Sequence, residues 1–165
     1  MIKVKYLKEE KQQKIDVKAF ENALRKLIGE RIDVLVNNSV ISPIYYNYPG
    51  FIGTIIEYYL VKNFNHRCPT FPLRFTLGNS EDVIKYQYPD FRINDFIAEV
   101  KANKNISRDG IKFTKEQQKN FTNSTLIIWV GYSYEDNGIY IDDIKVRTYG
   151  ELTNNGKNKR VYKID

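Results

Sequence analysis

The stretch that decides the fold reads Tyr88-Pro-Asp-Phe-Arg-Ile-Asn-Asp-Phe-Ile-Ala-Glu-Val-Lys101. It predicts a tight β-hairpin, because the polar pair Asn94-Asp95 tolerates positive φ and separates two runs of strand-forming residues. With this pair as a two-residue loop, Ile93 pairs with Phe96. The same register places Asp90 directly across from Glu99.

Alternation along the two strands assigns each side chain to one face of the hairpin. The charged side chains share one face: Asp90, Arg92, Glu99 and Lys101. The apolar side chains and the proline share the other: Pro89, Phe91, Ile93, Phe96, Ala98 and Val100. The sequence therefore predicts one face that packs on a core and one face that carries charge.

Two opposed carboxylates on the charged face need a compensating partner. Directly opposed residues have Cβ atoms about 4.5–5.5 Å apart, and like charges there are destabilising. At an effective dielectric constant of 20, the repulsion is about 3 kcal/mol. Arg92 and Lys101 offer one solution as ion-pair partners. A divalent cation offers another, since Mg²⁺ and Mn²⁺ prefer hard oxygen ligands, and we favour it because exposed ion pairs contribute only about 0–1 kcal/mol.

The hairpin resembles the signature of the PD-(D/E)xK nuclease superfamily in three parts: Pro89-Asp90, then eight intervening residues, then Glu99-Val100-Lys101. This superfamily includes type II restriction endonucleases and Holliday-junction resolvases. The resemblance implies an α/β (α+β) restriction-endonuclease-like fold with an αβββαβ core, a central mixed sheet flanked by helices. It also implies that Asp90 and Glu99 hold Mg²⁺ or Mn²⁺, with the Val100 carbonyl as a further ligand. Lys101 would orient or deprotonate the attacking water, or contact a phosphate.

Two further positions have more than one interpretation. Glu57 matches the acidic residue that many family members carry on the helix before the first core strand, where it would complete the metal shell as a catalytic residue. Thr54-x-x-Glu57 is equally a helix capping box, so both roles stay open. Several family branches also place a glutamine near the active site, on the helix after the motif. We prefer Gln118 for that role, because Gln117 belongs to the capping box opened by Thr114.

The hydrophobic pattern around the hairpin predicts the remaining elements. These are a helix over 16–29 with Asp16 as N-cap, a helix over about 54–63, an edge strand within 70–77, a strand over 82–88, a short helix after Thr114, a doubly buried strand over 125–130, and strands over 139–146 and 161–164. We expect a single nuclease domain over 1–165 with its core at about 53–131, an N-terminal helical extension and a C-terminal β extension.

Composition and charge fit a protein that binds a polyanion. One cysteine and one histidine leave little room for a disulfide, a multi-cysteine zinc site or Ser-His-Asp chemistry. The net charge of +6 is concentrated in residues 1–31, 101–120 and 145–165, which flank an acidic middle. Within the last segment, the turn with Lys157, Lys159 and Arg160 is a candidate for contacts to DNA phosphates. A solvated hairpin loop is the alternative.

We therefore expect a Mg²⁺-dependent DNA endonuclease. The leading interpretation is a type II restriction endonuclease that cuts double-stranded DNA as a homodimer, because cutting both strands needs two symmetry-related sites. The alternatives are a branched-DNA resolvase and a catalytically inactive nucleic-acid-binding module on the same scaffold. Met1-Ile-Lys-Val-Lys lacks the apolar core of a signal peptide behind it, so we expect a cytoplasmic protein without a membrane partner.

Overall fold

A six-stranded sheet forms the centre of the molecule. The computed structural model describes residues 16–33, 35–36, 39–40, 49–75, 91–93, 96–104, 110–135 and 138–164. The strand order is β1-β9-β8-β6-β5-β4, and β6 and β8 pair in parallel while the other neighbours are antiparallel. The strands are β1 (Arg31–Ile32), β4 (Leu73–Phe75), β5 (Phe91–Ile93), β6 (Phe96–Lys104), β8 (Leu126–Glu135) and β9 (Gly138–Thr148).

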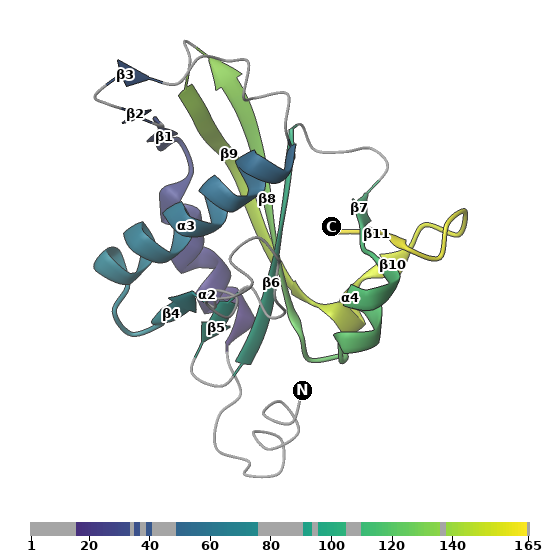
Figure 1. Cartoon of the computed structure of the whole chain (residues 1–165). Coiled ribbons are helices and arrows are strands. Elements are labelled where there is room, and N and C mark those ends of the chain that lie inside the picture. The colour runs from purple at the N-terminus through teal and green to yellow at the C-terminus, as the bar shows by residue number, and fades with distance from the viewer. Residues whose placement is uncertain are drawn as a thin grey trace, which may run out of the picture.

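Helices and two small sheets surround this main sheet (Figure 1). The helices are α2 (Val17–Leu24), which continues into the 3-10 turn η1 (Arg25–Leu27), α3 (Pro49–Arg67), α4 (Lys115–Asn120) and the 3-10 turn η3 (Tyr149–Glu151). The small sheets are β10-β11-β7, from Thr153–Asn154, Val161–Lys163 and Ile111–Lys112, and the pair β2-β3, from Leu35–Val36 and Ser39–Val40. No helix in the described ranges is long and apolar enough to cross a membrane.

One face of the main sheet, which we call the helical face, is covered by α2 and α3 (Figure 1). Asp16 caps α2 by accepting a hydrogen bond from the Ala19 amide at 2.9 Å, which confirms the predicted N-cap. The helices contribute a buried apolar stripe of Phe20, Leu24, Ile52, Ile56, Leu60 and Phe64. The strands meet it with Ala98, Val100, Leu126, Ile128, Val130, Ile144 and Val146. Burial of this stripe is the main source of stability on this side.

The helical face also buries one carboxylate. Glu21 on α2 is 3% exposed and accepts hydrogen bonds from Lys18, from the backbone amide of Val146 and from Arg147 on β9. Burial alone would raise the pKa of Glu21, but these donors outweigh it and lower the pKa to about 2. This carboxylate therefore joins α2 to β9 as a charged structural contact.

The opposite face, which we call the module face, is covered by a second unit. This basic module comprises residues 110–121 and 149–164, and contains α4, η3 and the sheet β10-β11-β7 (Figure 1). Its Ile111, Phe113 and Phe121 pack on Ile127 and Trp129 of β8 in a separate small core. Because β8 contacts both cores, its buried run Leu126–Tyr132 confirms the predicted doubly buried strand.

The hairpin register is confirmed where the structure describes it. Ile93 pairs with Phe96, and Phe91 pairs with Ala98. Asp90, the loop Asn94-Asp95 and the predicted strand over 82–88 lie outside the described residues. β4 begins directly after Pro72 and forms the edge of the sheet, as predicted.

The second predicted helix is wrong in its limits. α3 begins at Pro49, five residues before Thr54, and it runs to Arg67. Thr54 is therefore inside the helix and cannot be its N-cap, so the capping role of Glu57 is also wrong. Proline is favoured in the first turn of a helix, and full burial of Ile52 extends the apolar stripe one turn towards the N-terminus.

Candidate active site

The candidate site lies on β6, at the point where the main sheet meets the basic module. Glu99 and Lys101 alternate with Ala98 and Val100, which belong to the core of the helical face. Glu99 and Lys101 consequently point to the module face. Glu99 is 5% exposed and Lys101 is half-buried. Two charged groups thus lie at a covered position of the sheet, where charge is costly unless it has partners or a function.

Gln117 of α4 connects these two groups. Its Nε2 donates to Glu99 Oε1 at 2.8 Å, and its Oε1 accepts from Lys101 Nζ at 3.1 Å. The same Oε1 accepts from the Thr114 amide at 2.9 Å, while Thr114 Oγ1 accepts from the Gln117 amide at 3.0 Å. The predicted capping box is therefore confirmed. Because the carbonyl end of Gln117 faces two donors, its orientation is determined and its amide end faces the carboxylate.

Aromatic and basic side chains surround the pair. The Lys101 ammonium lies 5.6 Å from the centre of the Phe113 ring, within the range of a cation–π contact. In the parallel register Lys101 is beside Trp129, which is in turn paired with Lys145 on β9. The Lys145 ammonium lies 5.8 Å from the Trp129 ring. This face thus carries two lysines, each beside an aromatic ring: Lys101 beside Phe113 and Lys145 beside Trp129.

Gln118 lies one residue further along α4 and points into the basic module. Its Nε2 donates to the Lys159 carbonyl at 3.0 Å and to the Tyr162 hydroxyl at 3.2 Å, and reaches the Tyr149 hydroxyl at 3.5 Å. Tyr149 donates to Tyr162 at 2.8 Å. The predicted preference for Gln118 over Gln117 as the glutamine beside Glu99 and Lys101 is therefore wrong, because the amide that contacts them is that of Gln117. This pairing depends on how α4 packs on β6, which sequence spacing does not reveal.

The donor set at Glu99 fits a hard cation. A carboxylate and the neighbouring Val100 carbonyl are the oxygen ligands that Mg²⁺ and Mn²⁺ prefer. Within the described ranges no three His, Cys, Asp or Glu side chains gather closely enough to bind a metal. Asp90 is outside these ranges. The last described pair of the hairpin register is Phe91 with Ala98, which stops one residue short of Asp90 and Glu99. The metal site stays a prediction.

Glu57 belongs to α3, which lies on the helical side of the sheet (Figure 1). Glu99 instead points to the module face, where it accepts a hydrogen bond from Gln117 of α4. Glu57 is half-buried and flanks Ile56, which is fully buried in the helical-face core. With the capping role removed, its role as a metal ligand stays a prediction.

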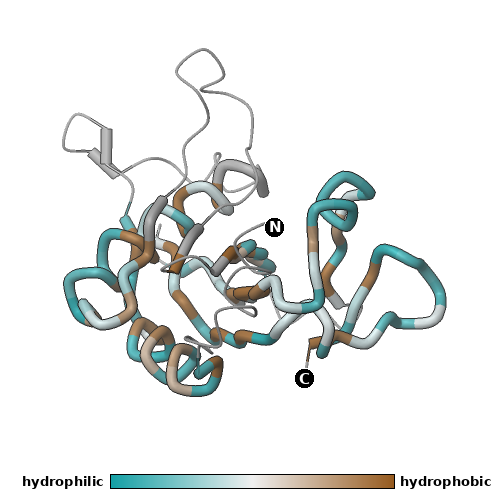
Figure 2. The backbone as a smooth tube through the Cα atoms, turned by 90° about the horizontal axis from the view of Figure 1, so that it is seen from below, coloured by the Kyte–Doolittle hydropathy of each residue, from teal (hydrophilic) through white to brown (hydrophobic). Residues whose placement is uncertain are grey.

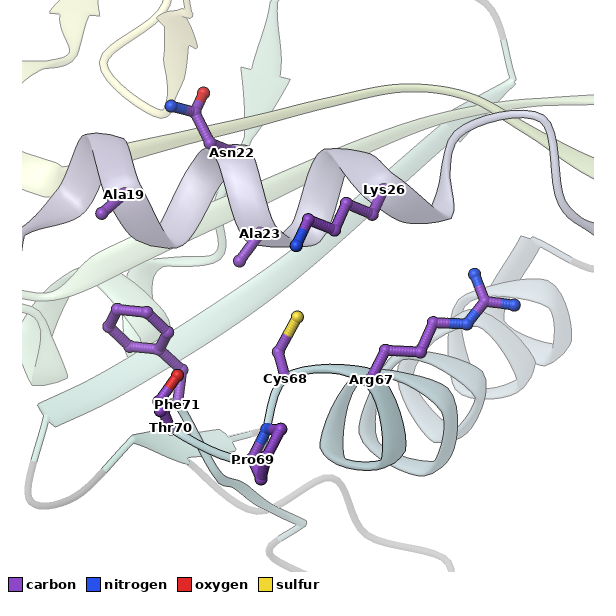
Figure 3. Close-up of a pocket in the computed structure, with 9 residues that line it drawn as sticks. All are labelled: Ala19, Asn22, Ala23, Lys26, Arg67, Cys68, Pro69, Thr70 and Phe71. Atoms are coloured by element: carbon purple, nitrogen blue, oxygen red, sulfur yellow. The ribbon is translucent and has the colours of Figure 1, made fainter.

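A hollow of about 420 Å³ opens on the helical face, between α2 and the turn that follows α3 (Figure 3). Lys26, Arg67 and the Cys68 thiol line it together with Phe71. Arg67 forms an ion pair with Glu30. The hollow lies across the sheet from Glu99 and Lys101, so it is separate from the candidate site.

Comparison with known proteins identifies the fold. No family model matches the sequence, and none of the curated proteins does. Among solved structures, the chain is similar to one titled NlaIV restriction endonuclease, with a TM-score of 0.56 over 92% of this chain and 68% of that chain. The chain has a restriction-endonuclease-like fold. At 16% sequence identity the likeness concerns the fold alone, and it confirms the predicted fold class with its curved mixed sheet and flanking helices.

Proposed function

We propose that this protein is a metal-dependent DNA endonuclease. The observation that carries the proposal is the pair Glu99 and Lys101, both directed from β6 into a covered site and joined by Gln117. Asp90, which lies outside the described residues, is the second carboxylate that we propose for this site, because it would oppose Glu99 if the register Phe91–Ala98 continued by one position. The fold similarity to a restriction endonuclease supports the same class of reaction.

Each residue has a distinct part in the proposed site. Asp90, Glu99 and the Val100 carbonyl would hold Mg²⁺ or Mn²⁺, with Glu57 as a further candidate ligand. The bound metal would supply charge neutralisation at the phosphate and activation of water. Water attacks phosphorus, the bond from phosphorus to the 3′ oxygen breaks, and a proton moves from the water to a base while the leaving oxygen is protonated.

Lys101 is the candidate for orienting or deprotonating that water. Its ammonium is held by the Gln117 carbonyl oxygen and lies beside the Phe113 ring. Both contacts restrict a side chain that is otherwise long and flexible. The neutral amide of Gln117 contacts the carboxylate and the ammonium at once, and so holds both groups in position for a scissile phosphate.

A type II restriction endonuclease that acts as a homodimer is the form of this activity that we propose. Each chain contributes one candidate site, and a double-strand break needs two sites related by two-fold symmetry. A site covered by a basic module suits duplex DNA, whose backbone carries a high density of negative charge.

The test is incubation of supercoiled plasmid with the protein in Mg²⁺, with EDTA and Glu99→Gln as controls. Discrete linear fragments in Mg²⁺ alone are the expected result. A smear would indicate a nonspecific nuclease. Cleavage of a synthetic four-way junction with intact plasmid would indicate a resolvase. Intact DNA in every metal, with retained DNA binding, would contradict the nuclease proposal and favour the inactive binding module.

A further inference from the structure

The lysines and arginines of the basic module form no ion pair with an acidic residue in the described part of the chain. Residues 110–121 and 149–164 contain seven lysines and arginines and two acidic residues. The ion pairs in the described part of the chain all lie elsewhere: Lys18–Glu21, Arg25–Asp143, Arg31–Asp33, Arg67–Glu30 and Arg147–Glu21. The seven cations are Lys112, Lys115, Lys119, Lys157, Lys159, Arg160 and Lys163. Cations elsewhere in the described fold are thus partly neutralised, whereas this module leaves its positive charge to solvent or to a ligand.

The most prominent part of the module is the loop of residues 154–160, which we call the tail loop. It lies at the far right in Figures 1 and 2, and Figure 2 shows a hydrophilic outer turn. Its asparagines are used to build the loop. Asn154 Oδ1 accepts from the Gly156 amide, Asn155 Oδ1 accepts from the amides of Lys157 and Asn158, and Asn158 Oδ1 accepts from the Arg160 amide, all at 2.9–3.0 Å.

These bonds decide what the tail loop can present to a partner. Asn154 Nδ2 also donates within the loop, to the carbonyls of Asn158 and Val161. The side-chain oxygens of Asn154, Asn155 and Asn158 and the amide group of Asn154 are therefore engaged in turn geometry, and base-edge recognition through these atoms would require breaking the loop. The exposed charged side chains of the tail loop are those of Lys157 and Lys159. The loop is a preformed display of cations, and such a display suits phosphate contacts.

The tail loop is also anchored to the helix that reaches the candidate site. Gln118 binds the Lys159 carbonyl, and its neighbour Gln117 binds Glu99 and Lys101. At the other end of the module, Gly110 has φ +93° and approaches the Tyr162 carbonyl so closely that a Cβ there would overlap with it. The module is therefore held at a fixed offset from Glu99 and Lys101.

From this geometry we propose that the tail loop is a preformed backbone clamp, in which Lys157 and Lys159 contact DNA phosphates and fix the duplex relative to Glu99 and Lys101. Gln118 is a positioning residue that holds the clamp to α4. The inference rests on the proposed nuclease function and deepens it by naming the surface that holds the substrate.

The surface fits a polyanion better than a protein partner. Stable protein interfaces use large apolar or aromatic anchors at their centres. Among the described residues the exposed large hydrophobic side chain is Tyr58, which belongs to α3 on the helical side. The aromatic rings of the module, such as Phe113, Tyr149 and Tyr162, pack against one another. An exposed surface of lysines around a packed aromatic core is suited to electrostatic binding.

The test compares two double variants with equal charge change. Lys157→Ala with Lys159→Ala removes the clamp, and Lys26→Ala with Lys62→Ala removes two exposed lysines from the helical side. Binding of a fluorescent 20-base-pair duplex is measured by anisotropy in Ca²⁺ without Mg²⁺, over a series of salt concentrations. We expect the clamp variant to bind at least 10-fold more weakly at 100 mM salt, with a log–log salt slope shallower by about 2, as loss of two phosphate contacts requires. The control should change affinity less than 2-fold.

A second pair of variants tests the positioning role without changing charge. Gln118→Ala removes the contacts to Lys159, Tyr149 and Tyr162, while Asn120→Ala removes an amide of the same helix that binds the Glu116 carbonyl. We expect Gln118→Ala to weaken DNA binding 3- to 10-fold with an unchanged salt slope, and Asn120→Ala to bind normally. The clamp proposal would be overturned if the two lysine double variants lost DNA affinity equally. It would also be overturned if the clamp variant and Gln118→Ala both bound DNA with wild-type affinity. If the variants give one of these results while the wild-type protein binds and cuts DNA, only the clamp is refuted. If the wild-type protein neither binds nor cuts DNA, the nuclease proposal is refuted as well.

Discussion

The two faces of the central sheet differ in what they bury. The helical face buries an extensive apolar cluster from α2, α3 and the strands, and the module face buries a smaller apolar cluster, which among the described residues comprises Ile111, Phe113, Phe121, Ile127 and Trp129. Beside that small core lie Glu99, Lys101 and Gln117. Along β6, Ala98 and Val100 pack in the core of the helical face, while the alternating Glu99 and Lys101 belong to the candidate site. The helical face supplies the stability that allows the module face to bury charge.

The same contrast appears in two buried carboxylates, Glu21 and Glu99, which are 3% and 5% exposed. Glu21 on the helical side is bound by two cations and a backbone amide. Glu99 on the module side accepts a hydrogen bond from the neutral amide of Gln117. A carboxylate held by cations is suited to joining elements. The contact from Gln117 brings no positive charge to Glu99, which fits our proposal that a bound cation completes this site.

The sharpest test of this contrast is Glu99→Gln. We expect it to reduce Mg²⁺-dependent cleavage by at least about 10³-fold, because loss of a metal ligand removes several kcal/mol of transition-state stabilisation. The melting temperature in metal-free buffer should stay within about 2 °C of wild type, since glutamine can still accept from Gln117. The matched control is Ile128→Ala on the helical face, which should cost about 2–5 kcal/mol of stability and preserve cleavage per folded molecule. The contrast between the faces fails if Glu99→Gln is the less stable of the two.

Gln117→Glu separates the two tasks of Gln117. Glutamate serves well at the third position of a capping box, so α4 should form normally. The new carboxylate faces Glu99 where an amide donated before, and we expect cleavage to fall about 10- to 100-fold, as is typical for partners of metal ligands. Thr114→Ala, which weakens only the cap, should cost about 1 kcal/mol of stability and leave cleavage per folded molecule intact. Wild-type cleavage by Gln117→Glu would reduce Gln117 to a helix cap.

Glu21→Gln should destabilise the protein by about 3 kcal/mol at pH 7 without a specific effect on cleavage. The magnitude follows from the lowering of the Glu21 pKa from 4.5 to about 2. A lowered pKa stabilises the folded state fully above about pH 4.5, and this contribution disappears as the pH falls towards 2. The difference in unfolding free energy between wild type and variant should therefore shrink between those pH values in denaturant titrations. A difference that is constant over this range would contradict the ionic role.

Glu57→Gln has the smallest expected effect. The helix should be unaffected, because α3 begins at Pro49 and does not depend on Glu57 as a cap. If Glu57 completes the metal shell, the Mg²⁺ concentration for half-maximal cleavage should rise about 2- to 10-fold. An unchanged Mg²⁺ titration would exclude Glu57 as a metal ligand and leave the metal to Asp90 and Glu99.

The sequence reveals those features of the fold that depend on local chemistry. The register Ile93–Phe96 follows from the polar pair Asn94-Asp95, and the start of α4 follows from the capping box at Thr114. Both are short-range effects, and each stabilises the folded chain by a few tenths to about 1 kcal/mol. The doubly buried β8 is readable from its continuous apolar run.

Features that depend on packing between distant segments are not readable in the same way. Thr54-x-x-Glu57 has the spacing of a capping box, yet α3 begins at Pro49 because Ile52 joins the buried stripe of Ile56, Leu60 and Phe64. The four-residue spacing of that stripe, together with a proline one turn earlier, is the signal that would have located the helix start. The contact from Gln117 to Glu99 requires α4 to lie against β6, which no local pattern of the chain encodes.

The most direct measurement of the central claim is a calorimetric titration of Mn²⁺ into the wild-type protein and into Glu99→Gln, in the absence of DNA. We expect saturable binding to wild type and loss of that binding in the variant, with both proteins equally folded by circular dichroism. Equal Mn²⁺ binding by the two proteins would contradict the assignment of the module face as the metal-bearing, catalytic face of the sheet.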